Sequence, residues 1–157
     1  MSRALRNALG CFATGVAVIT TRYEEQDAGM TCSSFNTVSL DPALVLWSLQ
    51  NNANSRDAFL HSGGYTVNVL SAEQMPLVMK FATGTQAERF ADLTLERAPS
   101  GRVLLPGCVA WFDCSLHQRV EAGDHDVLIG RVEAFDHLPG QGLIFERSQL
   151  GVMQTAA

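Results

Sequence analysis

The segment TCSSFNTVSLDP, residues 31–42, lies between two stretches that are typical of strands, and Pro42 ends it. Residues 15–21 (GVAVITT) are rich in β-branched side chains, and residues 43–49 (ALVLWSL) form a mostly apolar run of the kind buried on both faces of a sheet. A strand over residues 30–35 is expected to pair with the first of these runs across a polar loop at 22–28. The polar segment should therefore lie between neighbouring strands of one sheet.

The rest of the chain predicts more strands and a few short helices. Two long β-rich segments flank a tight turn at residues 122–124 and predict a hairpin. The strands are expected over 65–70, 108–119, 127–135 and 143–146. Helices are expected over 3–13, lying across a sheet, over about 55–61, and over 71–82, where Ser71 and Gln74 form a capping-box pattern. Residues 83–106 indicate a long surface loop.

This order of elements favours a barrel or sandwich of antiparallel strands, decorated with helices, over a doubly wound sheet. The composition is 46% hydrophobic and 17% charged, and 157 residues suit one domain spanning 1–157. A net charge of −5 argues against nucleic acid and anionic membranes as partners. The longest apolar run is too short to span a bilayer, and residues 1–10 lack the apolar centre of a signal peptide, so cytoplasmic residence is expected.

Four cysteines and four histidines show no pattern of metal ligation. The chain has no C-x-x-C, and the histidines at 61, 117, 125 and 137 lack zinc-ligand spacing. Reduced thiols are expected, because the chain is larger than a typical disulfide scaffold and shows no export signal. No metal site is predicted.

The polar segment 31–42 has two interpretations. Serine, threonine and asparagine are ordinary turn residues, so the segment could simply connect two strands. A strand followed by a turn also exposes backbone N–H groups and hydroxyls together, which suits the carbonyls, ring nitrogens and phosphate of a flavin.

Six motifs in a fixed order strengthen the flavin interpretation, because they resemble the flavin reductase family over about residues 5–151. They are FATGVAVITT (12–21), GMTCSSFNTVSLDP (29–42), VNVL (67–70), KFA (80–82), RF (89–90) and GDH (123–125). The resemblance implies a mainly β fold with short helices, an FMN-binding split β-barrel, which binds FMN or FAD as a homodimer. Serine or cysteine stands at positions 33 and 32, where the family often has asparagine or alanine, so the choice of flavin stays open.

The resemblance also implies roles for individual residues around the flavin. The isoalloxazine would be lined by Thr31, Cys32, Ser33, Ser34 and Phe35, with Ser39 beside it. The ribityl chain or phosphate would meet Asn51, Asn54 and Ser55 at the expected start of a helix, where backbone N–H groups favour an anion. Phe81 and Ala82 match another contact segment of the family, and Arg89, otherwise an ordinary surface charge beside Glu88, would neutralise the phosphate.

His125 is the candidate catalytic residue. A histidine after a turn between two aspartates is commonly a hydrated surface residue, but in the family the Gly-Asp-His turn reaches the flavin and the nicotinamide. Hydride passes directly between the two rings, so the protein needs no covalent nucleophile. A role in positioning the nicotinamide carboxamide or the flavin is therefore expected.

The function expected from these features is hydride transfer from NADH or NADPH to FMN or FAD, with release of the reduced flavin to a separate monooxygenase. Two alternatives stay open: a flavin-binding module without useful NAD(P)H turnover, and a flavin oxidase of small organic substrates. A hydrolase triad of Ser33 or Ser34 with His125 is disfavoured, because the chain has no G-x-S-x-G motif.

Overall fold

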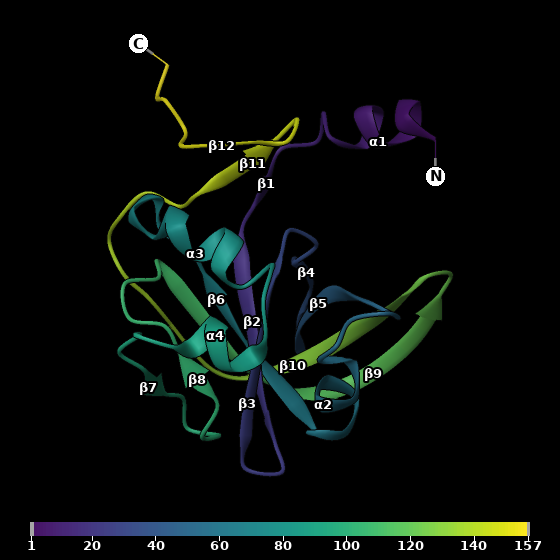
Figure 1. Cartoon of the computed structure of the whole chain (residues 1–157), viewed down its shortest axis with the longest axis vertical. Helices are drawn as coiled ribbons and strands as arrows, with labels where there is room; N and C mark the ends of the chain where they lie inside the picture. Colours follow the sequence, from purple (N-terminus) through teal and green to yellow (C-terminus); the bar gives the residue numbers. More distant parts are fainter. Residues whose placement is uncertain (1, 157) are drawn as a thin grey trace.

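The computed structural model describes residues 2–156, which form one curled antiparallel sheet with two smaller sheets and short helices on its flanks (Figure 1). The helices are α1 (Arg3–Leu9), α2 (Arg56–His61), α3 (Met75–Lys80) and α4 (Gln86–Phe90), with a 3-10 turn at Ala72–Gln74. The strands are β1 (Thr14–Gly15), β2 (Ala17–Tyr23), β3 (Gln26–Cys32), β4 (Asn36–Leu40), β5 (Ala43–Gln50), β6 (Gly64–Val69), β7 (Glu96–Arg97), β8 (Val103–Leu104), β9 (Ala110–Ala122), β10 (His125–His137), β11 (Ile144–Glu146) and β12 (Gln149–Gly151). The prediction of a mainly β split barrel with short helices is confirmed.

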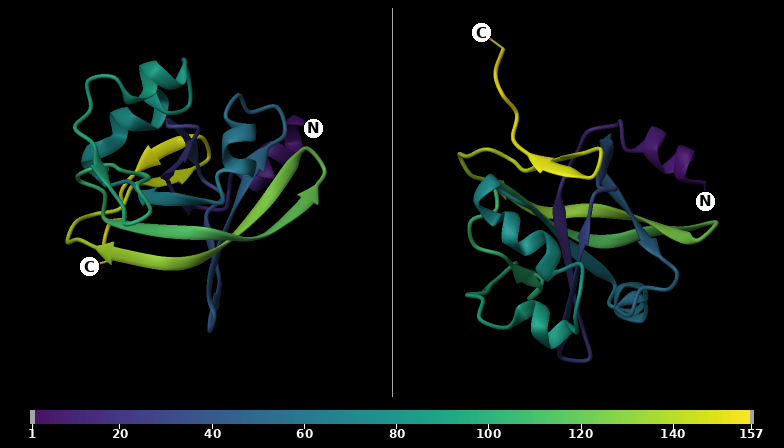
Figure 2. Two further views of the ribbon diagram at one scale, coloured as in Figure 1. Left: turned by 90° about the horizontal axis from the view of Figure 1, so that it is seen from below. Right: turned by 45° about the horizontal axis from the view of Figure 1, so that its top comes forward.

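The main sheet has seven strands in the order β3-β2-β6-β9-β10-β5-β4, and every neighbouring pair is antiparallel. Its concave face encloses a core in which Trp47 contacts Phe59 and Tyr65 edge-on, with ring centroids 4.9 and 5.9 Å apart. Phe59 comes from α2, which therefore covers one end of the barrel (Figure 2). A second core, built around Leu70 and Phe81, lies under α3, α4 and the β11–β12 hairpin.

Three predicted elements differ from the structure in their length, continuity or burial. The first helix stops at Leu9, with Gly10 as its C-cap, and none of its residues is buried, so it does not lie across a sheet as predicted. Residues 71–82 divide into the 3-10 turn and α3, because Pro76 has no N–H to continue one helix through this point. The run 43–49 buries only alternate side chains and is not buried on both faces.

The predicted loops were wrong in three places. The segment 22–28 is mostly strand, because β2 and β3 are joined by a two-residue turn at Glu24 and Glu25, both with positive φ. Residues 36–40 are not a turn but strand β4, and residues 83–106 contain α4, β7 and β8. Strand β12 also follows the last predicted strand.

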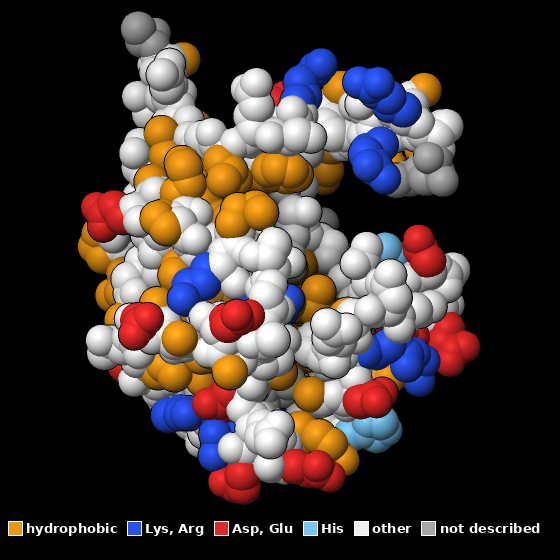
Figure 3. All heavy atoms as spheres, in the orientation of Figure 1, with side chains coloured by type: hydrophobic (Ala, Val, Ile, Leu, Met, Phe, Trp, Pro, Cys, Tyr) orange, Lys and Arg blue, Asp and Glu red, His pale blue; other side chains and the backbone are white. Residues whose placement is uncertain are grey.

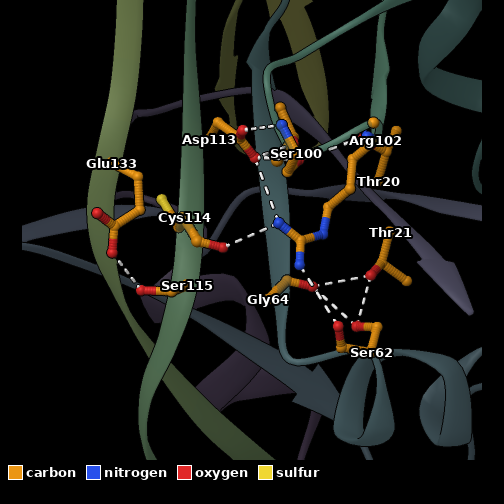
Figure 4. Close-up of polar contacts among 12 residues, drawn as sticks. Thr20, Thr21, Ser62, Gly64, Ser100, Arg102, Asp113, Cys114, Ser115 and Glu133 are labelled. Carbon is orange, nitrogen blue, oxygen red and sulfur yellow. Dashed lines mark hydrogen bonds and ion pairs between the residues drawn. The ribbon is translucent and has the colours of Figure 1, made fainter.

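A buried polar cluster fixes the β7–β8 hairpin to the main sheet (Figure 4). Asp113 on β9 accepts hydrogen bonds from Thr66, from the Ser100 amide and hydroxyl, and from Arg102, whose Nη1 lies 3.3 Å from the carboxylate. Arg102 also donates to the carbonyls of Cys114 and Ser62. Since its polar groups are paired with one another, this cluster is structural rather than a ligand site.

Gly64 makes the close packing at this cluster possible. A Cβ at this position would lie 2.2 Å from the Cys114 carbonyl oxygen and 2.7 Å from Nη2 of Arg102. The neighbouring Gly63 is required for a different reason, its positive φ of 77°, which ends the connection from α2. No helix within residues 2–156 is long and apolar enough to cross a membrane.

Candidate functional site

The first three residues of the polar segment, Thr31, Cys32 and Ser33, help to line two neighbouring hollows of the barrel. The apolar hollow has a volume of about 190 Å³ and is lined by Val16, Thr31, Cys32, Ser33, Val78, Ala82, Phe145 and Leu150. The polar hollow has a volume of about 420 Å³ and is lined by Met30, Thr31, Gln50, Asn52, Ala53, Asn54, Ser55, Ala82 and Arg89. Thr31 and Ala82 line both, so the two hollows are parts of one groove.

Thr31 is held in place where the two hollows meet. Its hydroxyl donates a 2.6 Å hydrogen bond to the carbonyl of Val78 on α3, and its backbone N–H donates to the carbonyl of Phe81. These bonds fix the end of β3 against α3 and the turn that carries Ala82. The groove therefore has a rigid wall made from segments about 50 residues apart in the sequence.

The thiol of Cys32 lies in the wall of the apolar hollow and is almost completely buried. Burial raises the pKa of this thiol, and the nearby Ser34 hydroxyl, 3.1 Å from Sγ, lowers it less. Ser34 in turn accepts a 2.8 Å hydrogen bond from the Ser48 amide. Cys32 is thus a neutral, packed residue at neutral pH.

Arg89 is the only charged residue that lines the polar hollow. Its Nε donates to the Thr83 carbonyl at 3.0 Å and its Nη1 to the Gly29 carbonyl at 2.7 Å, which leaves Nη2 without a hydrogen bond to any of residues 2–156. Burial lowers the pKa of this guanidinium, which still stays charged at neutral pH. A cation held by two carbonyls beside amide and hydroxyl side chains suits a phosphate.

His125 is the first residue of β10 and lies beside the polar hollow without lining it. Its backbone pairs with Gln50, which does line the hollow. The Asn51 amide and side chain donate to the carbonyls of Asp124 and Gly123, at 3.0 and 3.1 Å, and so join the hairpin tip to the loop after β5. The His125 ring places Nδ1 2.7 Å from the Asp124 carboxylate, which leaves Nε2 for another partner.

A buried carboxylate next to His125 holds the tip of the hairpin in place. Asp126 is buried and receives hydrogen bonds of 2.8 Å from both Arg56 on α2 and Arg119 on β9. Burial raises the pKa of this carboxyl, but the two guanidinium groups outweigh burial, so the pKa lies below its usual value. The position of His125 relative to the loop 51–55 is therefore set by an ion-paired cluster.

The structure brings seven of the residues selected from the sequence to the groove: Thr31, Cys32, Ser33, Asn54, Ser55, Ala82 and Arg89. The others lie outside its lining. Ser34 caps the Ser48 amide, Phe35 packs against Phe112 with tilted rings and centroids 5.5 Å apart, and Phe81 is fully buried in the second core. Ser39 lies on β4, and Asn51 supports the His125 hairpin.

Sequence reasoning missed the apolar half of the groove. Val78, Phe145 and Leu150 lie on α3, β11 and β12, and Val16 lies between β1 and β2. No local pattern distinguishes these residues from other core residues. Neither Ser33 nor Ser34 hydrogen-bonds to His125 within residues 2–156, which agrees with the rejection of a hydrolase triad. No group of three or more metal-binding side chains is found among these residues.

The donor set fits a flavin. An apolar hollow suits a planar ring, and the adjoining polar hollow offers amides and hydroxyls for a polyol and one guanidinium for a phosphate. No acidic side chain lines either hollow, so an anionic group is not repelled. This arrangement defines the protein as one that binds a planar, anionic ligand in a split barrel.

Comparison with known proteins identifies the family. Residues 9–153 match the model of the flavin reductase like domain, and the chain belongs to this family. It is 40% identical over 150 residues to FMN reductase (NADH) SmoA of Agrobacterium fabrum, covering 96% of this chain and 85% of that protein. The chain also matches the reductase component of a trigonelline monooxygenase of Acinetobacter baylyi, but it covers only 47% of the length of that protein.

Solved structures agree with this assignment. Nitrilotriacetate monooxygenase component B of Mycobacterium thermoresistibile is similar with a TM-score of 0.93 and 32% identity, covering 99% of this chain and 90% of that one. The NADH:FAD oxidoreductase SgcE6 of Streptomyces globisporus, in complex with NAD and FAD fragments, is similar with a TM-score of 0.89 and 31% identity, covering 97% and 91%.

Proposed function

We propose that this protein is an NAD(P)H-dependent flavin reductase that transfers a hydride to FMN or FAD and supplies the reduced flavin to a separate monooxygenase. The groove carries this proposal, because it joins an apolar hollow to a polar hollow that ends at a partly unpaired guanidinium. The names of relatives that are FMN or FAD reductases and monooxygenase components support it. That residues 1–157 form a single domain stays a prediction. The cytoplasmic location of the protein also stays a prediction.

Each part of the groove has a task in this function. The flavin, when bound, supplies the ring that accepts the hydride from the nicotinamide. The side chains of the apolar hollow exclude water from this ring, and Thr31 fixes the wall of the groove where the ring joins the ribityl chain. Arg89 binds the phosphate. His125, whose Nδ1 faces Asp124, offers Nε2 to the nicotinamide carboxamide and so orients the second ring for transfer.

A direct assay tests the proposal. Purified protein is mixed with NADH or NADPH and with FMN or FAD under air, and the absorbance of the reduced nicotinamide is followed. Oxidation that depends on both protein and flavin is expected. Flavin binding without nicotinamide oxidation would instead favour the flavin-binding module, and oxidation with no donor and flavin pair would overturn the proposal.

Replacement of Arg89 should weaken FMN binding selectively. The change Arg89→Gln removes the only cation of the polar hollow, and a hydrogen bond to a charged group contributes about 1.5–3 kcal/mol, so the Kd for FMN should rise about 10- to 100-fold. Riboflavin differs from FMN only by the missing phosphate, so its Kd should stay unchanged. Flavin fluorescence titration measures both, and an equal loss for the two ligands would show that Arg89 acts through the fold.

We also propose that the protein is a homodimer, as the family resemblance implies. Large apolar side chains are exposed along β4 and at the end of β10, with Leu40 94% and Phe135 65% exposed. Phe112 lies between Phe35 and Phe135, with centroid distances of 5.5 and 6.4 Å, and so connects the two regions. An exposed apolar surface of this kind marks a protein interface, and a second copy is the simplest symmetric partner.

The change Leu40→Asp should separate the dimer. It places a charge at the most exposed apolar side chain of this surface, whereas Met79→Asp places the same charge on α3, where Met79 is 62% exposed. Sedimentation equilibrium should give twice 17.0 kDa for the wild-type protein and for Met79→Asp, and 17.0 kDa for Leu40→Asp. A wild-type protein that sediments as a monomer would contradict the proposal.

A further inference from the structure

The tip of the β9–β10 hairpin carries two neighbouring residues that lie on opposite faces of strand β10. Asp126 lies on the inner face with Leu49, its partner on β5, and both residues are buried. His125 lies on the other face with its own partner Gln50, which lines the polar hollow. Successive side chains of a strand alternate between its two faces. Contacts that fix Asp126 inside the barrel therefore also fix the direction of His125 outside it.

Strand pairing holds this tip from one side only. Strand β10 pairs with β5 as far as His125, but β9 pairs with β6 only as far as Ser115. Among residues 2–156, the segment 116–122 of β9 pairs with no strand other than β10. The hairpin accordingly extends beyond the other strands of the main sheet (Figures 1 and 2). A two-stranded ribbon has little stability of its own, so side-chain contacts are needed to hold this end in place.

Two arginines from different elements supply these contacts at the Asp126 carboxylate. Arg119 on β9 donates from Nε to Oδ1, and Arg56, the first residue of α2, donates from Nη2 to Oδ2. The Asp126 side chain is 1% exposed, whereas those of Arg56 and Arg119 are 27% and 35% exposed. Arg119 also donates to the exposed carboxylate of Glu121 at 2.9 Å. Figure 3 shows basic and acidic side chains gathered over α2 and this hairpin, at the right of the molecule. The cluster therefore connects β9, β10 and α2.

The contact between Arg56 and Asp126 leaves a polar atom of Arg56 unsatisfied. Nε of Arg56 is buried without a hydrogen-bond partner, and within residues 2–156 its guanidinium donates to no side chain other than Asp126. A buried donor without a partner is unfavourable, and a buried ion pair is a weak source of stability. Stability alone is therefore a poor reason for this arrangement, which points to a role in the neighbouring site.

Arg56 directly follows the loop that lines the polar hollow. Ser55 lines this hollow and is the N-cap residue of α2. The loop is closed by backbone hydrogen bonds of its own, from the Arg56 amide to the Ala53 carbonyl and from the Ala53 amide to the Gln50 carbonyl. Because the loop has these bonds, its shape does not depend on Asp126. The carboxylate instead sets the place of the hairpin relative to the loop.

From these contacts we infer that Asp126 is a positioning residue for hydride transfer, which holds His125 at a fixed place relative to the loop of the polar hollow. The inference rests on the proposed function, in which His125 orients the nicotinamide. Asp126 itself lines neither the apolar hollow nor the polar hollow and acts through the two arginines. Its effect on rate comes from geometry, because a displacement of about 1 Å can cost about 10²-fold in rate.

A double-mutant cycle with His125 tests the inference. In Asp126→Asn an NH2 group, which cannot accept a hydrogen bond, replaces one carboxylate oxygen, so one guanidinium loses its partner. The turnover number, measured per flavin site counted by fluorescence titration, should fall about tenfold, because a small displacement of His125 loses near-attack geometry. The Kd for FMN should stay within about twofold of the wild-type value, because the loop keeps its shape. In the His125→Ala background the same change should alter turnover less than about twofold, since no ring is left to position.

A second variant removes one cation of the cluster in place of the buried carboxylate. Arg119→Gln changes a partly exposed side chain and leaves Asp126 paired with Arg56, so it disturbs the fold less. It should lower turnover in the wild-type background and have little effect in the His125→Ala background. This variant decides the question if Asp126→Asn does not fold.

Asp27→Asn is the matched control. Asp27 also receives two guanidinium groups, from Arg22 and Arg97, but it lines neither the apolar hollow nor the polar hollow. Its replacement removes a comparable pair of ion contacts from the β2–β3 hairpin, and the turnover number should equal that of the wild-type protein.

Several outcomes would overturn the inference. A fall in turnover by the same factor with and without His125 would show that Asp126 acts only through the fold. Turnover that is unchanged in both Asp126→Asn and Arg119→Gln, an equal fall in Asp27→Asn, or a loss of FMN affinity as large as the loss of turnover would also contradict it. A wild-type protein that oxidises neither NADH nor NADPH is a distinct result, which contradicts the proposed function itself and the inference with it.

Discussion

The change His125→Ala should lower the turnover number about 100-fold while the Kd for FMN stays nearly unchanged. The ring is fixed by Asp124 at 2.7 Å and lies on a hairpin that Asn51 joins to the loop beside the polar hollow. Its removal leaves the groove intact but frees the nicotinamide to adopt unproductive orientations, and loss of near-attack geometry can cost about 10²-fold in rate. Steady-state oxidation of NADH and flavin fluorescence titration measure the two quantities.

His117→Ala is the matched control for this prediction. His117 is an exposed histidine on strand β9 of the same hairpin and lines neither the apolar hollow nor the polar hollow. Its replacement should leave both the turnover number and the Kd for FMN unchanged. If His125→Ala instead reduced flavin affinity as much as turnover, His125 would be a flavin-binding residue rather than one that positions the nicotinamide.

The largest effect on stability is expected for Arg102→Met. Its guanidinium is the cation beside the buried Asp113 carboxylate, and the two side chains are only 14% and 4% exposed. Removing one member of a buried ion pair leaves the other charge without compensation, which costs about 3–5 kcal/mol of the free energy of unfolding. Urea denaturation followed by tryptophan fluorescence should show a large decrease in the midpoint.

Two further variants show whether the lost charge is the cause. Arg97→Met removes a more exposed arginine, 43% exposed, that pairs with Asp27, and should cost about 1 kcal/mol or less. The double variant Arg102→Met/Asp113→Asn removes both charges and keeps a side-chain oxygen for Thr66 and Ser100, so it should be more stable than Arg102→Met alone. A double variant that is only as stable as Arg102→Met would mean that packing of Arg102, and not its charge, is what matters.

Periodic segments were predictable from the sequence, whereas short elements were not. The residues of the β9–β10 hairpin and of strand β6 prefer the strand conformation along their whole length. Their local sequence was therefore enough to predict these strands. The turn at Glu24 and Glu25 was missed because glutamate rarely adopts positive φ, and nothing in its chemistry signals a tight turn. Helix α4 has only five residues, although Thr85 and Glu88 form a capping box that could have revealed it.

The candidate site divides in the same way. The polar residues at 31–33 and 54–55 are contiguous and therefore visible as motifs, and Arg89 was found through the family pattern. Phe145 and Leu150 were missed because the chain brings them to the groove only through the sheet of β1, β11 and β12.

The small sheet of β1, β11 and β12 shares no strand with the main sheet, and the apolar hollow lies between them. A ligand that fills this hollow therefore touches both sheets and holds them together. Binding to the folded state alone stabilises a protein in proportion to the logarithm of ligand concentration. We therefore expect the β11–β12 hairpin to be attached more firmly to the barrel as the flavin concentration rises. The end of α1 would be held more firmly with it, because the Arg147 amide of this hairpin donates a 2.7 Å hydrogen bond to the Gly10 carbonyl.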